Sequence, residues 1–220
     1  MSTSKRALIW DIDGVIADTA EYHFEAWQYV FQKQGVKFTK EEFLRNFGQR
    51  NDTIIRITLG AIPPEKAEAI AREKEENYRK RARGHIKPLP GVIRLIKSLT
   101  EHGFACAVAS SGPIENIQLV LRELGIEDYF QAIVYGREVT EGKPSPQVFL
   151  LAAKKLGVEP KNCIVIEDAV AGVAAAKSAG MHCIAVTNTH PRERLAGADM
   201  VVTTLAEVSV SELERLLKSP

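Results

Sequence analysis

Cysteine is scarce in this chain of 220 residues, and its three copies follow no motif. Cys106, Cys163 and Cys183 lie in or beside apolar runs, and no two of them are spaced as a CxxC pair. An odd number without such spacing argues against a disulfide framework and against a zinc site. Buried free thiols suit a reducing compartment, and the short stretch before the first apolar run predicts no signal peptide. We therefore expect a cytoplasmic protein.

The chain also lacks an excess of charge of either sign. Lys and Arg total 29 against 28 Asp and Glu, for a net charge of +1. No overall field attracts nucleic acid or an acidic membrane, so any recognition of phosphate must be local. No apolar run approaches the ~20 residues of a membrane-spanning helix. We expect neither nucleic acid nor a membrane as a partner, and the neutral charge with a self-contained core favours a monomer.

What the sequence does have is an alternation of strand-like and helical segments. Apolar residues make up 45% of the chain, as in an ordinary globular protein. Strands are expected at residues 7–10, 104–109, 132–135, 164–166, 182–186 and 200–202, and helices at residues 92–102, 114–124, 146–156, 169–179 and 206–218. Strands that alternate with helices predict an α/β fold with a doubly wound parallel sheet and right-handed crossovers.

Residues 18–83 depart from this pattern, because they contain no convincing strand. Residues 21–34 carry apolar side chains at three- and four-residue spacing, which predicts an amphipathic helix. The highly charged residues 65–83 predict a solvated helix with one packed face. We interpret residues 18–83 as a small α-helical cap inserted after the first strand, and residues 1–17 with 84–220 as the α/β core.

The end of the first strand carries the strongest candidate site. Four apolar residues are followed by Asp11 and Asp13, and then by Gly14. Strand residues two apart point to the same side, so both carboxylates can converge beyond the carboxyl end of the strand, where open α/β sheets bind ligands. The glycine lets the backbone turn sharply and approach a ligand. Taken alone, the segment also fits a surface turn with two solvated Asp residues.

Three further segments carry polar residues at or beyond the ends of expected strands. They contribute Ser110 with Ser111, Lys143, and Glu167 with Asp168. Each segment alone fits a helix start or a solvated surface. Their joint placement at the ligand-binding edge is much harder to explain by chance. Carboxylates gathered around one spot call for a hard divalent cation. Mg²⁺ fits best, because it takes few carboxylates and keeps water ligands.

This combination of residue types suits phosphoryl transfer. A carboxylate beside Mg²⁺ and a lysine can attack phosphorus and form an aspartyl-phosphate. The charge of the transferring phosphoryl group needs cationic and hydroxyl partners, which Lys143, Ser110 and nearby backbone amides can supply. Asp13 can give a proton to the leaving oxygen and later take one from water.

The order and placement of these segments resemble the four motifs of the haloacid dehalogenase superfamily. The matching residues are Asp11-x-Asp13-Gly14-Val15, Ser110, Lys143-Pro144 and Glu167-Asp168. The resemblance implies that the helical insertion is the cap of that superfamily. It also implies phosphoryl transfer, because the superfamily's dehalogenases lack the second Asp, which is present here.

Roles follow from this resemblance residue by residue. It implies that Asp11 is the nucleophile and Asp13 the general acid/base. It implies that Ser110 and Lys143 hold the transferring phosphoryl group. The magnesium ligands that it implies are Asp11, the main chain of Asp13, Asp168 and Glu167.

Within the superfamily, residues 18–27 resemble the β-phosphoglucomutase subgroup, whose matching Thr and His lie at the hinge and mouth of the cap. The substrate-binding residues expected from this are His23, Trp27, Arg50, Lys74 and Ser111. His23 and Trp27 also fit a helix start and a core aromatic. Arg50 and Lys74 also fit a solvated helix face.

One departure from the mutase pattern separates two activities. The mutase carries Ser-x-Ser-Lys-Asn from the motif serine onward, and the later residues help hold a second phosphate. Here Pro113 stands in that stretch, with no amide to donate and no lysine in its place. The sequence therefore favours a Mg²⁺-dependent phosphatase of small phosphorylated metabolites, sugar phosphates first among them. The alternatives are a β-phosphoglucomutase, which interconverts β-glucose 1-phosphate and glucose 6-phosphate, and a binding module that has lost its chemistry.

Overall fold

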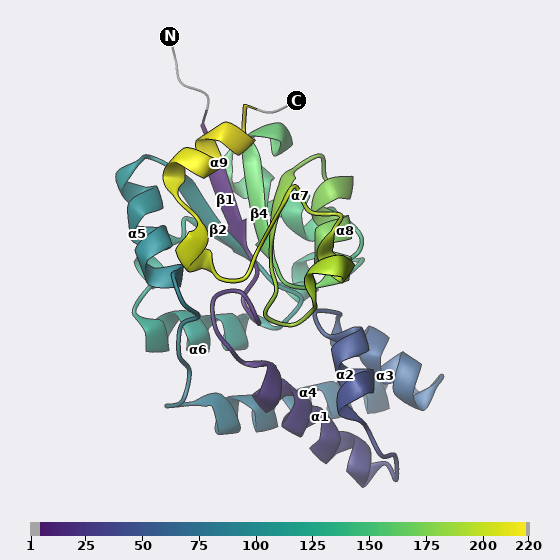
Figure 1. Cartoon of the computed structure of the whole chain (residues 1–220). Helices are drawn as coiled ribbons and strands as arrows, with labels where there is room; N and C mark the ends of the chain where they lie inside the picture. Colours follow the sequence, from purple (N-terminus) through teal and green to yellow (C-terminus); the bar gives the residue numbers. More distant parts are fainter. Residues whose placement is uncertain (1–4, 219–220) are drawn as a thin grey trace.

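The computed structural model describes residues 5–218, and its core is built on one six-stranded sheet (Figure 1). The strands lie in the order β3-β2-β1-β4-β5-β6, and every pairing is parallel. Their bounds are β1 Ala7–Trp10, β2 Ala105–Ala109, β3 Ala132–Val134, β4 Cys163–Glu167, β5 His182–Val186 and β6 Met200–Val202. The strand order reverses between β1 and β4, which is where such sheets bind ligands. The structure confirms the doubly wound parallel sheet.

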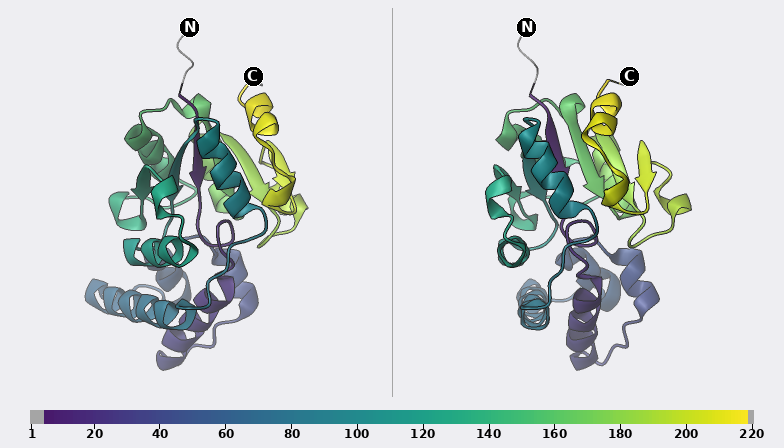
Figure 2. Two further views of the ribbon diagram at one scale, coloured as in Figure 1. Left: turned by 90° about the vertical axis from the view of Figure 1, so that its left-hand side faces the viewer. Right: turned by 60° about the vertical axis from the view of Figure 1, so that its left-hand side comes forward.

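Helices cover both faces of the sheet (Figure 2). One face packs against α5 Val92–Glu101, α6 Ile114–Leu124 and α9 Val210–Leu216, and the other against α7 Gln147–Leu156 and α8 Val170–Ser178. The alternation of side chains along β1 explains the two layers, because Leu8 and Trp10 enter one apolar cluster and Ile9 the other. A strand buried on both faces reads in the sequence as an unbroken apolar run.

Short 3₁₀ helices connect several of these elements and explain one difference from the sequence prediction. They are η1 Glu127–Tyr129, η2 Gly136–Glu138, η3 Pro160–Asn162, η4 Arg192–Leu195 and η5 Leu205–Glu207. The C-terminal helix expected from residue 206 begins instead at Val210. The reason is that η5 ends at Glu207 and Ser209 then starts a new helix with its own capping box.

The insertion after β1 is helical and has an apolar centre of its own. Its helices are α1 Ala20–Lys33, α2 Lys40–Asn46, α3 Asn51–Leu59 and α4 Pro64–Ala82, which lie below the sheet in Figure 1. Its buried apolar residues are Trp27, Val30, Phe31, Phe38, Phe43, Phe47, Ile54, Ile55 and Ile70. The structure confirms a helical cap after the first strand, facing the end of the sheet toward which β1 runs. Its limits at residues 18 and 83 remain our assignment.

The predicted packed face of α4 is present, but it is not purely apolar. Its buried residues are Ile70, Lys74, Glu75, Tyr78 and Ala82. Lys74 is 2% and Glu75 6% exposed, although this helix was expected to keep its charges in solvent. Charged side chains are seldom fully buried unless they are paired. Here Lys74 Nζ lies 2.8 Å from Glu75 Oε1, so the two charges compensate each other inside the cap.

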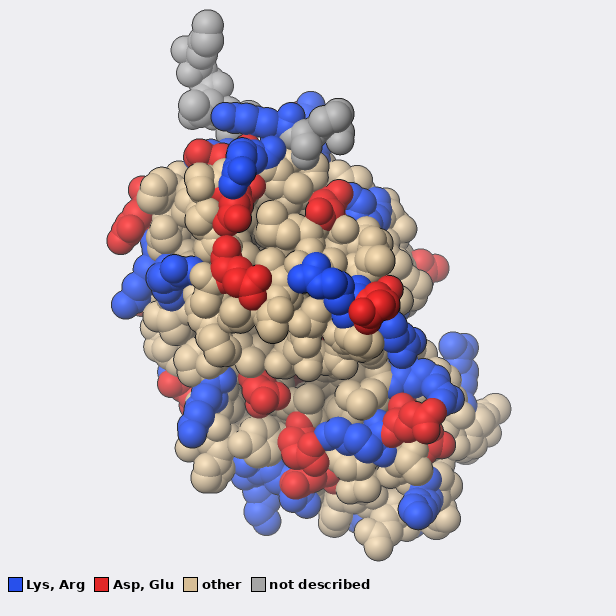
Figure 3. All heavy atoms as spheres, viewed as in Figure 1, with Lys and Arg blue, Asp and Glu red and all other residues tan. Residues whose placement is uncertain are grey.

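The surface shows the balance of charge expected from composition. On the face drawn in Figure 3, acidic and basic side chains are interspersed over core and cap, and no single sign dominates. Within residues 5–218, no helix combines the length and the apolarity needed to cross a membrane. The cysteines are free and buried, as predicted. This face therefore presents no large patch of positive charge to an anionic ligand.

Candidate active site

The turn after β1 is held by the backbone and depends on a glycine. The Ile12 carbonyl accepts the amides of residues 15–17 at distances of 2.9 to 3.3 Å. Gly14 has a φ of +83°, which side chains other than glycine rarely adopt. A Cβ at this position would also overlap the Asp168 carboxylate. The glycine therefore lets the chain reverse after β1 and lets the loop after β4 approach it.

Lys143 lies at the centre of a buried acidic cluster. Its Nζ is 2.5 Å from Asp11 Oδ1 and 2.5 Å from Glu167 Oε1. The side chain is buried and lies over the Phe149 ring, with 5.1 Å between Nζ and the ring centroid. The lysine thus links the carboxyl ends of β1 and β4, which are neighbouring strands. Residues predicted to share one edge of the sheet are in direct contact.

Glu167 and Asp168 serve different purposes in this core cluster. Both Glu167 oxygens are occupied, Oε1 by Lys143 and Oε2 by the amides of Asp168 and Ala169, each at 2.9 Å. Asp168 Oδ2 accepts a hydrogen bond from the Thr189 hydroxyl, in the loop after β5. Its Oδ1 has no hydrogen-bond partner among residues 5–218. Glu167 therefore fixes the lysine and the loop, whereas Asp168 is held by the Thr189 hydroxyl through one oxygen.

The core cluster holds more negative than positive charge. Burial raises the pKa of Asp11 to about 7; Lys143 opposes the rise, and the charges of Glu167 and Asp13 add to it. Burial, with the charges of Glu167 and Asp11, raises the pKa of Asp168 well above its usual range. Burial tends to lower the pKa of Lys143, but the two acids beside it raise it overall, so it stays a cation. A bound cation would relieve this excess of carboxylates.

Asp13 faces a second cluster, most of which comes from the cap. Its Oδ1 accepts the Thr19 hydroxyl at 2.5 Å and lies 3.0 Å from His23 Nε2. Lys74 Nζ is 2.8 Å from His23 Nδ1 and 2.8 Å from Glu75 Oε1. A protonated lysine can only donate, so Nδ1 accepts and the ring proton is on Nε2, facing Asp13. These residues form a chain of hydrogen bonds with a defined direction, from Lys74 to Asp13.

The two aspartates are two residues apart and have opposite pKa shifts. Burial tends to raise the pKa of Asp13, but its contacts with His23, the Thr19 hydroxyl and the charge of Lys74 outweigh it and lower the pKa. The His23 ring is also stacked on the Tyr78 ring, with 3.9 Å between centroids. The lowered pKa favours the carboxylate form of Asp13, and its contacts hold it in one orientation.

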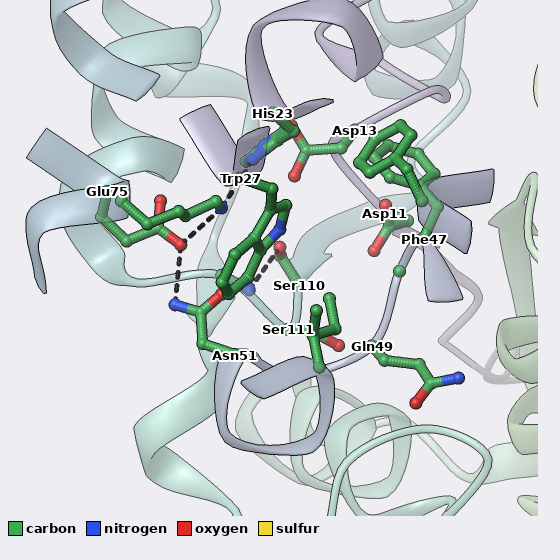
Figure 4. Close-up of a pocket in the computed structure, with 15 residues that line it drawn as sticks. Asp11, Asp13, His23, Trp27, Phe47, Gln49, Asn51, Glu75, Ser110 and Ser111 are labelled. Carbon is green, nitrogen blue, oxygen red and sulfur yellow. Dashed lines mark hydrogen bonds and ion pairs between the residues drawn. The ribbon is translucent and has the colours of Figure 1, made fainter. Parts of the chain in front are cut away.

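A narrow cavity of about 40 Å³, partly open to solvent, lies between core and cap (Figure 4). The core lines it with Asp11, Asp13, Ser110, Ser111 and Gly112. The cap lines it with His23, Trp27, Phe43, Phe47, Gly48, Gln49, Asn51, Ile54, Lys74 and Glu75. A ligand there would meet both aspartates on one side and aromatic side chains on the other.

Seven of the predicted site residues line this cavity, whereas Lys143, Glu167, Asp168 and Arg50 do not. The first three belong to the core cluster around Asp11. The Arg50 guanidinium donates to the carbonyls of Val139 and Thr140 at 2.8 and 3.3 Å, and it pairs with Asp52. This predicted substrate contact lies outside the lining and joins the cap to a core loop instead. Trp27 lines the cavity and also belongs to the apolar centre of the cap, as both interpretations of it allowed.

Sequence reasoning missed Thr189, Glu75 and Asn116. Thr189 follows β5 by three residues, so its place beyond a parallel strand was an available signal. Glu75 and Asn116 are in contact, because Asn116 Nδ2 donates to Glu75 Oε2 at 2.6 Å. One lies on the cap helix α4 and the other on the core helix α6, and no spacing in the sequence relates them.

Fold and site together define a class of enzyme: α/β proteins whose strand ends bring an aspartate and a lysine together beside a cavity that an inserted helical cap covers. Within that class, residues 8–186 match the family model described as haloacid dehalogenase-like hydrolase. The match covers most of the 220 residues, and the chain belongs to this family.

Its relatives include a mutase and a phosphatase. The β-phosphoglucomutase of Bacillus subtilis (strain 168) is 35% identical over 219 residues, which cover 94% of this chain and 93% of that protein. The fructose-1-phosphate phosphatase YqaB of Escherichia coli (strain K12) is 34% identical over 184 residues, covering 81% of this chain and 95% of that protein. A crystal structure of β-phosphoglucomutase from Clostridium difficile has a TM-score of 0.88 at 30% identity and covers 97% of both chains. Similarity alone therefore leaves both activities open.

Proposed function

We propose that the protein is a Mg²⁺-dependent phosphatase of small phosphorylated metabolites, with sugar phosphates as its substrate class. The observation that carries the proposal is the 2.5 Å contact between Lys143 Nζ and Asp11 Oδ1, beside a cavity lined by Asp11 itself. In the first step an Asp11 oxygen bonds to phosphorus while the bond from phosphorus to the substrate oxygen breaks. Lys143 and Ser110 hold the transferring group and offset its charge.

Asp13 handles the proton in both halves of the reaction. In its protonated form it gives a proton to the leaving oxygen, which departs as the alcohol. As a carboxylate it then takes a proton from the water that attacks the aspartyl-phosphate, and this releases inorganic phosphate and restores Asp11. The two transfers balance, so Asp13 ends as it began. The lowered pKa of Asp13 favours the carboxylate form that the second role needs, so the first role requires that Asp13 take up a proton before the leaving oxygen departs.

The donor set fits Mg²⁺, as expected for the family. Within residues 5–218 no three His, Cys, Asp or Glu side chains form a ready-made metal cluster, but Mg²⁺ needs only one or two carboxylates beside water and substrate oxygens. We assign the ion to Asp11, Asp168 and the main-chain carbonyl of Asp13. Glu167 was also predicted as a ligand; with both oxygens occupied, it would act by fixing Asp168. When bound, the ion supplies positive charge to the phosphoryl oxygens and to the acidic cluster.

The cations of the site favour a hydrolase over a mutase. A mutase must hold both phosphates of a bisphosphate while it turns around, which needs a second anion site. Lys74 is engaged by His23 and Glu75, and Arg50 is engaged by two core carbonyls. Neither cation is available to a second phosphate in this arrangement. The mutase remains the second candidate because of the 35% identity to a β-phosphoglucomutase.

The test is a panel of sugar phosphates on which released phosphate and isomerised sugar are measured together. We expect phosphate release that requires Mg²⁺, is lost with EDTA, and falls at least about 10⁴-fold in Asp11→Asn. Asp128→Asn, the same change at an exposed position, should keep full activity. Conversion of β-glucose 1-phosphate to glucose 6-phosphate with a bisphosphate primer and little free phosphate would establish the mutase. If neither product forms on any substrate, the protein is the binding module that has lost its chemistry. The monomeric state is a separate prediction.

A further inference from the structure

The chain of hydrogen bonds that ends at Asp13 does not stop inside the cap. Glu75 is 6% exposed and receives three side-chain donors. Two come from the cap, Lys74 Nζ and Asn51 Nδ2, each 2.8 Å from Oε1. The third is Asn116 Nδ2 from the core, 2.6 Å from Oε2. The carboxylate that orients Lys74 is thus itself oriented across the boundary between cap and core.

Asn116 is built into this position. It is 3% exposed and lies in the first turn of α6, which begins just after the Ser110–Gly112 loop. Its Oδ1 accepts a hydrogen bond from Arg79 at 2.9 Å, so both ends of the amide are used. Glu75 and Arg79 are four residues apart on α4 and share one face of that helix. The amide can satisfy both partners only when α4 is docked on α6.

We propose that Asn116 is a positioning residue for proton transfer by Asp13: by holding Glu75 it fixes Lys74 against His23 Nδ1, and thereby His23 against Asp13. The inference rests on the proposed phosphatase function for its kinetic consequence. The inference goes beyond the proposed function by making proton transfer depend on contact between cap and core. The acid/base group is fully oriented only when a residue on the helix after the phosphate loop has engaged the cap.

The test uses the dependence of rate on the leaving group. A sugar alcohol is a poor leaving group and needs the proton from Asp13, whereas p-nitrophenolate leaves readily without one. Asn116→Asp keeps the size of the side chain and the acceptor for Arg79, but it replaces the donor to Glu75 with a second carboxylate. For this variant we expect kcat/KM to fall about tenfold or more on the best sugar phosphate of the panel, and by less than about threefold on p-nitrophenyl phosphate.

A reciprocal change should restore the contact. In the double variant Asn116→Asp with Glu75→Gln, the new Gln amide can donate to the new Asp, and its oxygen can still accept Lys74. We expect its kcat/KM on the sugar phosphate to return to within about threefold of the starting protein. Asn77→Asp is the matched control, because Asn77 lies on the same helix and contacts Arg81 at the surface. It should leave both rates unchanged. Equal losses on both substrates, or no rescue, would mean that Asn116 only docks the cap.

A measurement without turnover separates this inference from the proposed function. Nitrogen-15 NMR of the His23 ring at constant pH should show the proton on Nε2 in the starting protein and a mixture of tautomers in Asn116→Asp. If no substrate of the panel is hydrolysed, the phosphatase proposal fails while the NMR result still decides the role of Asn116. An unchanged His23 spectrum in Asn116→Asp would overturn the positioning role, whatever the enzyme does.

Discussion

Two clusters of charged side chains differ in their balance of charge. The core cluster consists of Lys143, Asp11, Glu167 and Asp168. The relay, which lies mostly in the cap, is the chain of hydrogen bonds through Glu75, Lys74, His23 and Asp13. In the core, Asp11, Glu167 and Asp168 surround one lysine, and the pKa values of Asp11 and Asp168 are raised. In the relay, Lys74 contacts the Glu75 carboxylate directly and the Asp13 carboxylate through His23. The pKa values of Asp13 and Glu75 are lowered. The difference is that the core cluster has an excess of carboxylates, which the proposed Mg²⁺ would offset, whereas the relay balances its charges with side chains of its own.

This contrast explains how two aspartates separated by one residue can do different chemistry. Asp11 lies among carboxylates that burial and mutual repulsion destabilise, so its ionised form depends on Lys143. Asp13 is stabilised as a carboxylate by Thr19, His23 and Lys74, all provided by the chain. These environments push the two pKa values apart. In the proposed mechanism Asp11 attacks only as a carboxylate, so Lys143 and the proposed Mg²⁺ must offset its raised pKa. Each prediction below probes one side of this contrast.

The largest effect is expected from removing the core lysine. Lys143→Met leaves buried carboxylates without their ammonium, and we expect a loss of about 3–5 kcal/mol in the free energy of unfolding in EDTA, with no measurable turnover. Mg²⁺ should restore part of that stability, because it supplies the missing positive charge. Urea unfolding at fixed pH, with EDTA or with Mg²⁺, measures both quantities.

Lys74→Met is the matched variant for the relay. It also removes a buried lysine, so we expect a comparable loss of stability. Mg²⁺ should restore none of it, because we assign the ion to Asp11 and Asp168 and not to the relay. If Mg²⁺ restored stability equally in both variants, or in neither, the proposed difference in charge balance between the two clusters would be wrong.

A smaller effect with a defined pH dependence is expected at Glu75. Burial tends to raise its pKa, but Lys74, His23 and Asn51 lower it below the ordinary value of 4.5. An acid whose pKa is lowered by folding stabilises the fold above its unfolded-state pKa, and this stabilisation is lost as the pH falls through the folded-state pKa. Glu75→Gln should therefore cost about 2 kcal/mol at pH 7, and the cost should shrink as the pH falls below about 4.5.

The measurement is a series of urea titrations of both proteins from neutral to acid pH. Glu76→Gln changes the neighbouring, exposed glutamate and should alter stability by less than about 0.5 kcal/mol. A difference between Glu75→Gln and the starting protein that stays constant down to acid pH would show that the charge of Glu75 does not stabilise the fold.

The sequence predicted the core cluster far better than the relay, for a physical reason. Asp11 follows β1 and Glu167 ends β4, and the carboxyl ends of parallel strands meet at one edge. The order of elements therefore implies that these side chains are close, and Lys143 follows from the same reasoning. Only the division of labour between Glu167 and Asp168 needed the structure, because it depends on which oxygen each donor reaches.

The relay depends on how two helical layers dock, which no periodicity encodes. The spacing of Ile70, Lys74 and Tyr78 shows that they share a face of α4, but not that this face meets His23 and α6. The same limit applies to Arg50. It was predicted to contact substrate, and in this structure it donates to two carbonyls of a core loop. The sequence could not predict the contacts between cap and core, because they join residues far apart in the chain and depend on tertiary packing.

The smallest effect sharpens the core side of the contrast. The Thr189 hydroxyl donates to Asp168 Oδ2 and leaves Oδ1 for a ligand, so it should orient Asp168 toward the ion without touching it. Groups that orient metal ligands typically contribute 10- to 100-fold to affinity, and a single partly buried hydroxyl belongs at the low end of that range. Thr189→Val should weaken Mg²⁺ binding about tenfold, measured by calorimetric titration, and leave the stability in EDTA nearly unchanged. Thr187→Val, the same change two residues earlier on a side chain that makes no hydrogen bond within residues 5–218, should bind Mg²⁺ as before. If both variants keep full affinity, Asp168 is oriented by burial and by the Gly14 turn alone, and the core cluster needs no support from the loop after β5.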